Sequence, residues 1–392
     1  MSESSFSGSR PERTSTMVHQ KVISLWRSPV SHLLAWCALC SAFLFVSSCR
    51  TPGASTSKNA VTAPVMQAES LRTEQVHLAP VPAITTDVRI ASKHLYLVSR
   101  SNVGLMQPAV DAQGNVWVGE MNANQLDRLN TQSGEVTRWT PPGAQYGIMN
   151  TVLDGQGNVW FAEQNANYIG RFDPGQHAFH LFPLGSSKGS PLGPQDLHID
   201  SQGLLWFAGA SGGAIGQLDP KTGEVRIWPL PSSPSSIATT PDGHVWFGVD
   251  GALDVLDPST GQITSYALPD PQTQVFSMEA DTEGRLWFTE VLPGKLGMFD
   301  QETDSLTELP LPAVSGNAPA LYELVLDHQG MVWFVDVDAN ALVRYAPGKQ
   351  TLTFYRLSMP GSAPFGLTLD PAGRVWFTVG GAPTNYVGEM SR

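Results

Sequence analysis

Cysteine is scarce in this chain of 392 residues. The three cysteines are Cys37, Cys40 and Cys49, and none follows residue 49. Residues 50–392 therefore contain no disulfide bond, no thiol nucleophile and no cysteine-ligated zinc site.

Charge is also sparse, and most of it is of one sign. Asp, Glu, Lys and Arg make up 15% of the residues, and 35 acidic residues outnumber 23 basic ones. The net charge of −12 excludes a generic nucleic-acid-binding surface, because a phosphate backbone repels an acidic protein. The 37 glycines and 30 prolines argue against a helical bundle or a coiled coil. The sequence also has no phosphate-binding loop.

The first 48 residues have the pattern of an export signal. Basic residues precede a short apolar stretch, Leu33 to Val46, and Ser47 and Ser48 lead to Cys49. This ending resembles the bacterial lipoprotein signal, which implies cleavage before Cys49 and lipidation of that residue. We therefore expect a signal peptide over 1–48 and a flexible tether over 49–90. A plain signal peptide or a membrane anchor is the alternative.

Internal repetition predicts the fold of residues 91–392. An Asp-x-x-Gly or Asp-Gly turn precedes each of seven tryptophans, and each glycine lies three residues before its tryptophan. The spacing between successive tryptophans is 40 to 46 residues, which is typical of four-stranded propeller blades. The repeat tryptophans are Trp117, Trp160, Trp206, Trp246, Trp287, Trp333 and Trp376.

The seventh repeat ends without a fourth strand, and the front of the propeller supplies a candidate. Tyr96 lies 21 residues before Trp117, as Trp139 lies 21 residues before Trp160. We therefore predict an all-β, seven-bladed β-propeller in which residues 93–99 complete the last blade. This arrangement closes the ring and removes an exposed sheet edge.

The repeated Asp-x-x-Gly-x-x-Trp-Phe-x-Glu, followed by Ile-Gly-Arg, resembles the virginiamycin B lyases, also called streptogramin lyases. The clearest stretch runs from Glu163 to Asp173. The resemblance implies an elimination that opens a cyclic depsipeptide at its ester bond. In that reaction a histidine removes a proton, and a magnesium ion held by carboxylates stabilises the enolate.

The catalytic positions implied by the resemblance hold other residues in this chain. The base position is Phe365, and the partner histidine position is Tyr322. The two carboxylate positions are Ala363 and Val379. Phenylalanine accepts no proton and tyrosine is a poor base at neutral pH, so we expect the lyase chemistry to be absent.

Two rings of positions near the central channel hold the remaining candidate residues. We expect an apolar channel mouth that binds a ligand, formed by Met106, Met149, Gln195, Phe276, Tyr322, Glu323 and Phe365. Four acids at strand ends are candidate ligands of Mg²⁺ or Ca²⁺, namely Glu120, Glu163, Glu290 and Asp336. Asp196 and Glu323 lie near the same face. His198 is the one histidine in an innermost strand and a weak candidate base.

These patterns favour a monomeric, lipid-anchored binding module of the bacterial cell envelope, either facing the periplasm from the outer membrane or at the cell surface. Its partners would be the membrane, through the anchor, and a peptide, an envelope protein or an apolar small molecule, but not nucleic acid. Two alternatives stay open. One is a metal-dependent lyase acting on a streptogramin B or a related ester, and the other is an envelope scaffold without a small-molecule site.

Overall fold

The computed structural model describes residues 59–61, 65–69, 76–90, 95–99, 103–143, 147–291, 294–314, 316, 318–359, 362–380 and 384–390. All of them belong to one compact unit, Thr51–Arg392. The expected signal peptide and Cys49 lie outside the described residues. Within the described residues the regular structure is β, apart from the short 3-10 helix η3 (Pro347–Lys349), and no helix there is long and apolar enough to cross a bilayer.

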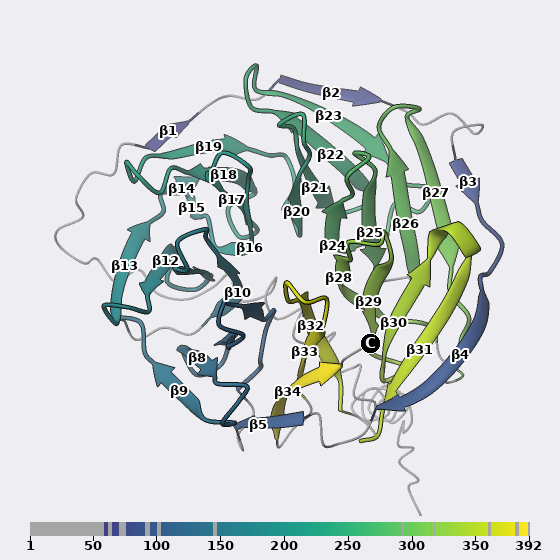
Figure 1. Cartoon of the computed structure of the whole chain (residues 1–392). Helices are drawn as coiled ribbons and strands as arrows, with labels where there is room; N and C mark the ends of the chain where they lie inside the picture. Colours follow the sequence, from purple (N-terminus) through teal and green to yellow (C-terminus); the bar gives the residue numbers. More distant parts are fainter. Residues whose placement is uncertain are drawn as a thin grey trace, which may run out of the picture. The chain divides into compact units, whose positions relative to one another are not determined.

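Seven blades, each with four antiparallel strands, surround a common axis and confirm the predicted seven-bladed propeller (Figure 1). Blades 1 to 3, from the axis outward, are β6 (Ala109–Val110), β7 (Val116–Glu120), β8 (Gln125–Leu129) and β9 (Val136–Trp139); β10 (Ile148–Leu153), β11 (Val159–Glu163), β12 (Tyr168–Asp173) and β13 (Ala178–Pro183); and β16 (Pro194–Ile199), β17 (Leu205–Gly209), β18 (Ala214–Leu218) and β19 (Val225–Pro229). A small hairpin, β14 (Ser186–Ser187) and β15 (Ser190–Pro191), connects blades 2 and 3.

Blades 4 to 7 repeat this order. Their strands are β20 (Ile237–Thr239), β21 (Val245–Val249), β22 (Ala252–Asp257) and β23 (Gln262–Ala267); β24 (Val275–Ala280), β25 (Leu286–Glu290), β26 (Lys295–Asp300) and β27 (Ser305–Pro310); β28 (Leu321–Leu326), β29 (Val332–Asp336), β30 (Ala341–Ala346) and β31 (Thr351–Leu357); and β32 (Pro364–Leu369), β33 (Val375–Val379), β34 (Asn385–Met390) and β5 (Leu95–Ser99).

The N-terminal strand closes the ring as predicted. Strand β5 pairs antiparallel with β34, and Tyr96 lies opposite Val387. The Tyr96 ring lies 6.1 Å from that of Trp376, which places the first and last parts of the propeller sequence in one blade. Blade 7 therefore has four strands, and the ring closes without a covalent bond.

A hydrogen-bond network explains the repeated turn. In blade 2, Asp154 accepts the backbone N–H groups of Gln156 and Asn158 on Oδ1 and the indole N–H of Trp160 on Oδ2, all at 2.9 Å. Gly157 has a φ of 83°, which an L side chain rarely adopts. The same aspartate-to-indole bond recurs in five other blades, in the pairs Asp111–Trp117, Asp200–Trp206, Asp281–Trp287, Asp327–Trp333 and Asp370–Trp376.

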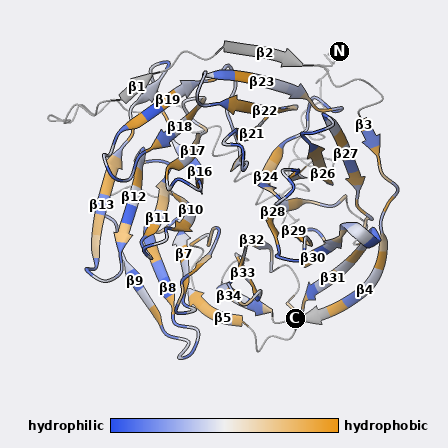
Figure 2. Ribbon diagram, turned by 45° about the horizontal axis from the view of Figure 1, so that its top comes forward, coloured by the Kyte–Doolittle hydropathy of each residue, from blue (hydrophilic) through white to orange (hydrophobic). Residues whose placement is uncertain are grey.

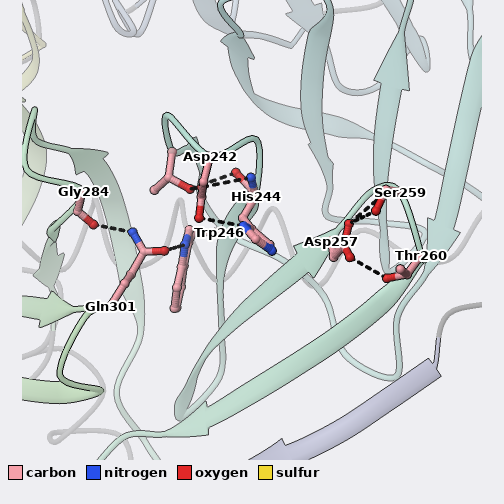
Figure 3. Close-up of polar contacts among 9 residues, drawn as sticks. Asp242, His244, Trp246, Asp257, Ser259, Thr260, Gly284 and Gln301 are labelled. Atoms are coloured by element: carbon pink, nitrogen blue, oxygen red, sulfur yellow. Dashed lines mark hydrogen bonds and ion pairs between the residues drawn. The ribbon is translucent and has the colours of Figure 1, made fainter.

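Blade 4 departs from this network because Thr240 occupies the aspartate position. The indole N–H of Trp246 instead donates to Gln301 Oε1, on a turn of blade 5, at 3.1 Å (Figure 3). Asp242 moves into the local turn, where it accepts from the Thr240 hydroxyl at 2.5 Å and contacts His244 Nδ1 at 2.8 Å. The indole hydrogen bond of blade 4 therefore reaches the neighbouring blade, whereas in the other six blades it stays within the blade.

Apolar residues lie along the blade strands, and many turns are hydrophilic (Figure 2). The phenylalanine that follows the repeat tryptophan packs onto a glycine of the third strand. A Cβ added to Gly170 would lie 2.1 Å from Phe161 Cζ, so no larger residue fits there. The Gly216–Phe207, Gly297–Phe288 and Gly388–Phe377 pairs repeat this contact. This explains the glycine of the Ile-Gly-Arg motif.

The segment expected to be a flexible tether differs from that expectation in its described residues. Four strands there run parallel to the outer strands of blades 3 to 6 and follow the rim of the ring (Figure 1). This outer belt consists of β1 (Asn59–Val61), β2 (Val65–Glu69), β3 (Val76–Leu78) and β4 (Ala83–Ile90), paired with β19, β23, β27 and β31. Edge pairing uses backbone N–H and C=O groups, so it requires no alternating apolar pattern in the sequence.

Candidate functional site

The innermost strands of five blades change register near their starts, beside the axis of the ring. The shifts occur in β10, β16, β24, β28 and β32, and in each strand they fall about ten residues before the repeat tryptophan. Such irregularities re-aim side chains out of the regular alternation. Two successive positions of each strand therefore contribute side chains near the axis.

An aromatic trio from blades 5, 6 and 7 lies at the first of these positions. The ring centroid of Phe276 is 4.7 Å from that of Tyr322 and 5.5 Å from that of Phe365. The Tyr322 and Phe365 rings are 5.2 Å apart. Tyr322 is fully buried, whereas the two phenylalanines keep partial exposure. Three blades that are distant in sequence thus share one aromatic contact.

Blades 1 and 2 extend this contact with methionines. Met106 and Met149 are buried in one apolar cluster with Leu197, and Phe365 packs against it. We call Met106, Met149, Phe276, Tyr322 and Phe365 the mouth cluster. Five of the seven residues predicted for the channel mouth are thus packed there. Gln195, on β16, is half-buried, and Glu323 belongs to the polar set described next.

A ring of polar residues occupies the next position of each strand, one residue closer to the tryptophan. Asn150 donates from Nδ2 to Gln107 Oε1 and, at 2.6 Å, to Asp196 Oδ1. Asp196 Oδ2 accepts the backbone N–H of Ile237 at 2.9 Å. These bonds connect blades 1 to 4. The polar ring consists of Gln107, Asn150, Asp196, Ser236, Ser277 and Glu323, with Gly366 at its blade 7 position.

The other half of the polar ring joins blades 5 and 6. The Ser277 hydroxyl donates to Glu323 Oε1 at 2.7 Å and accepts the backbone N–H of Leu324 at 3.2 Å. Farther along the same strands, the N–H of Leu326 donates to Glu279 at 2.7 Å. Sequence reasoning found Asp196 and Glu323 but missed Gln107, Asn150 and Ser277. Their polar character, recurring once per blade, was the available signal.

The two acids of the polar ring are shifted toward their protonated forms. Burial raises the pKa of Asp196 to about 7, although hydrogen bonds from Ile237, Leu197 and Asn150 oppose the shift. Burial also raises the pKa of Glu323 to about 8, and the negative charge of Asp196 adds to this effect. Asp196 lies on blade 3 and Glu323 on blade 6, at equivalent positions of their innermost strands.

The structure places the four lyase positions in or beside the mouth cluster without giving them lyase chemistry. Tyr322 and Phe365 belong to the aromatic trio. Ala363 and Val379 are buried, and neither side chain carries an oxygen atom. The magnesium ion implied by the resemblance would need carboxylates at these two positions, so the residues present do not fit it.

The four acids predicted as metal ligands lie at the last residues of β7, β11, β25 and β29, each with different neighbours. Glu120 shares Arg138 with Asp127, at 3.8 Å and 3.2 Å respectively. Asp336 accepts the N–H groups of Ala339 at 3.0 Å and Ala320 at 3.4 Å. In the part of the chain that the structure describes, no group of three or more His, Cys, Asp or Glu side chains is arranged to hold a metal ion.

The remaining two acids of this set are shifted by burial. Burial raises the pKa of Glu163 to about 8, and both of its carboxyl oxygens lack a hydrogen-bond partner. Burial also raises the pKa of Glu290 to about 8, with repulsion from Glu308 adding to the shift. His198, on β16, has its pKa lowered by burial, so it is neutral near pH 7.

The chain is similar to known proteins in sequence and in fold. The model of the virginiamycin B lyase family matches residues 91–388. Virginiamycin B lyase from Staphylococcus aureus superposes with a TM-score of 0.68 at 22% identity, covering 76% of this chain and 98% of that chain, and a catalytically inactive variant of it with quinupristin gives the same values. A streptogramin B lyase structure gives a TM-score of 0.67 at 23% identity, covering 76% and 97%. None of the curated proteins matches the chain.

Proposed function

Because the chain belongs to the virginiamycin B lyase family, we propose that it is a binding module that keeps the propeller of that family but lacks its lyase chemistry. The observation that carries this proposal is the packing at the implied base position. Phe365 contacts Phe276 and Tyr322 there, and no proton acceptor replaces it. An elimination without a positioned base loses the factor of about 10²–10⁴ that general base catalysis typically contributes.

The proposed ligand is a peptide segment, part of an envelope protein or an apolar small molecule at the mouth cluster. Partly exposed aromatic rings with nearby polar groups are typical of small-ligand sites. Phe276 and Phe365 supply the apolar contact, and Asp196 and Gln107 are half-buried beside it. The rings fit a ligand with an apolar stem.

The proposed location is the bacterial cell envelope, through a lipid on Cys49. The Ser47-Ser48-Cys49 ending supports export and lipidation. The acidic net charge gives no attraction to anionic lipid, so acyl chains would provide the anchoring. We expect the anchored protein to be a monomer.

Family membership also favours a second candidate, a metal-dependent lyase acting on a streptogramin B or a related ester. This alternative requires a base from outside the implied positions. Asp196 and Glu323 are the acids nearest the mouth cluster, so one of them would have to act as the base.

One experiment separates the two candidates. The full-length protein is incubated with a type B streptogramin and Mg²⁺, and ring opening is followed by liquid chromatography and mass spectrometry. We expect ring opening at the buffer rate. Ring opening at enzyme-like rates that Glu323→Gln abolishes, and exposed Glu302→Gln does not, would establish the lyase instead.

Binding is measured in parallel with 1-hexanol as an apolar probe. We expect saturable binding in isothermal titration calorimetry, weakened in Phe365→Leu, which removes the ring but keeps an apolar side chain. The control is Val88→Ser on the outer belt, which should leave binding unchanged. Absence of saturable hexanol binding would overturn the proposed ligand site.

A further inference from the structure

The polar ring presents hydrogen-bond acceptors toward the axis and has few donors to match them. Asn150 is 5% exposed and spends its amide N–H groups on Gln107 and Asp196. Its carbonyl oxygen has no hydrogen-bond partner among the described residues. This oxygen shares its carbon with the nitrogen that donates to Asp196. A buried acceptor without a donor is costly and calls for a donor from outside the chain.

No lysine or arginine among the described residues is paired with the two acids. Among the described residues, neither Asp196 nor Glu323 forms an ion pair with a lysine or an arginine. Their recorded partners are amide and hydroxyl groups. Buried carboxyl groups are ordinarily paired. A bound cation would supply the pairing that buried carboxylates ordinarily have.

The mouth cluster lies directly beside these acids along the chain. Phe276 precedes Ser277, and Tyr322 precedes Glu323. Two rings of the aromatic trio are therefore next in sequence to the two residues of the Ser277–Glu323 hydrogen bond. Aromatic faces attract cations, and the attraction grows when water is excluded. Because Asp196, Gln107, Phe276 and Phe365 keep partial exposure, solvent reaches this region.

We infer that the mouth cluster and the polar ring together recognise an N–H-bearing organic cation, a primary ammonium or a guanidinium, carried on an apolar stem. The inference rests on the proposed binding function and specifies the chemistry of its ligand. The N–H groups bond to Asp196, Glu323 and the Asn150 carbonyl oxygen, and the stem packs on the aromatic trio. An ammonium offers three donors and a guanidinium five, which suits an acceptor-rich site.

The test compares matched probes on the full-length protein by isothermal titration calorimetry. Hexylammonium and hexylguanidinium share their stem with neutral 1-hexanol. We expect at least one cation to bind at least about tenfold more tightly than 1-hexanol. Asp196→Asn and Glu323→Gln should reduce cation affinity to that of 1-hexanol. Exposed Asp250→Asn and Glu302→Gln are the controls.

A second set of probes distinguishes the source of the cation. An acetylated pentapeptide with a central arginine is compared with its citrulline counterpart, which is neutral and nearly isosteric. Preference for the arginine peptide over hexylguanidinium supports the inference with a protein side chain as the ligand. The reverse preference supports it with a free amine or guanidine as the ligand.

The outcomes separate this inference from the proposed function. If 1-hexanol binds and neither cation binds more tightly in the wild-type protein, the cation site is wrong and the apolar binding site stands. Cation affinity unchanged in Glu323→Gln would likewise overturn the cation site. If no probe binds, both proposals fail. The wild-type comparison needs no variant, so a variant that does not fold leaves the test decisive.

Discussion

Trp246 donates its indole N–H to Gln301, a residue of the next blade, at 3.1 Å. In six other blades the repeat tryptophan donates to an aspartate of its own turn. Gln301 also donates to the backbone oxygen of Gly284, so its amide joins strand β21 of blade 4 to two turns of blade 5. The Tyr266 hydroxyl crosses the same junction to Asp304 Oδ1 at 3.3 Å.

Gln301→Ala should therefore destabilise the propeller. The substitution removes the acceptor of Trp246 and the donor to Gly284, and we expect a loss of about 1–3 kcal/mol in the free energy of unfolding. Urea denaturation followed by tryptophan fluorescence measures it. Gln202→Ala, at an exposed turn of blade 3, is the control and should stay within about 0.5 kcal/mol of wild type. Equal stability of the two variants would contradict the role given to Gln301.

Thr240→Asp should give blade 4 the hydrogen bond from the tryptophan indole to an aspartate that the other six blades have. An aspartate there matches the six others, which bind the indole N–H on Oδ2 and turn amides on Oδ1. In the Thr240→Asp background, Gln301→Ala should cost less than in the wild type. A double-mutant cycle by urea denaturation measures this coupling. Strictly additive effects would show that the aspartate does not take over the indole.

Gly170→Ala should be among the more damaging single-methyl additions in the chain. The added Cβ would lie 2.1 Å from Phe161, a buried ring that has little room to move. We expect a loss of about 1–3 kcal/mol or more, measured as a fall in melting temperature and urea midpoint. Gly155→Ala, in the same blade with no heavy atom within 4 Å, is the matched control and should be neutral. A tolerated Gly170→Ala would mean that Phe161 can shift.

Stability should fall as the pH rises through neutrality, partly because of Glu163. Burial raises its pKa from 4.5 to about 8, so the folded protein holds a proton that the unfolded chain has already released above pH 4.5. This contribution is fully present below about pH 4.5 and is lost as the pH approaches 8. Glu163→Gln should flatten the decline in unfolding free energy between pH 5 and about 8, whereas exposed Glu302→Gln should not. Parallel profiles for wild type and Glu163→Gln would refute the assignment.

Deleting the outer belt, residues 50–90, should expose the outer strands of blades 3 to 6 but leave the ring closed. Strands β19, β23, β27 and β31 each lose a parallel partner, and β5 stays in place. Hydrogen exchange should speed up at the edge amides of these four strands. Strands β9 and β13, which have no belt strand, serve as internal controls. Unchanged exchange in β31 would argue against the pairing with β4.

The candidate site was predictable only in part. A fixed spacing from each tryptophan identified the apolar residues of the mouth cluster, because equivalent positions of equal blades meet at the axis. The polar ring escaped because a register shift brings a second residue of each innermost strand to the axis. Asn150 and Ser277 reveal their role only through partners 43 to 46 residues away. Whether these positions bind a ligand stays a prediction.

The sequence by itself determined the number of blades and the closure of the ring. Each repeat carries its own turn, tryptophan and strand pattern, and this information is local. Only the tertiary structure decided which blades share hydrogen bonds, that Asp196 and Glu323 take part in them, and that residues 59–90 include strands that follow the rim. The physical reason is that backbone edge pairing and electrostatic repulsion across the ring depend on distances in space, and neither leaves a periodic mark in the chain.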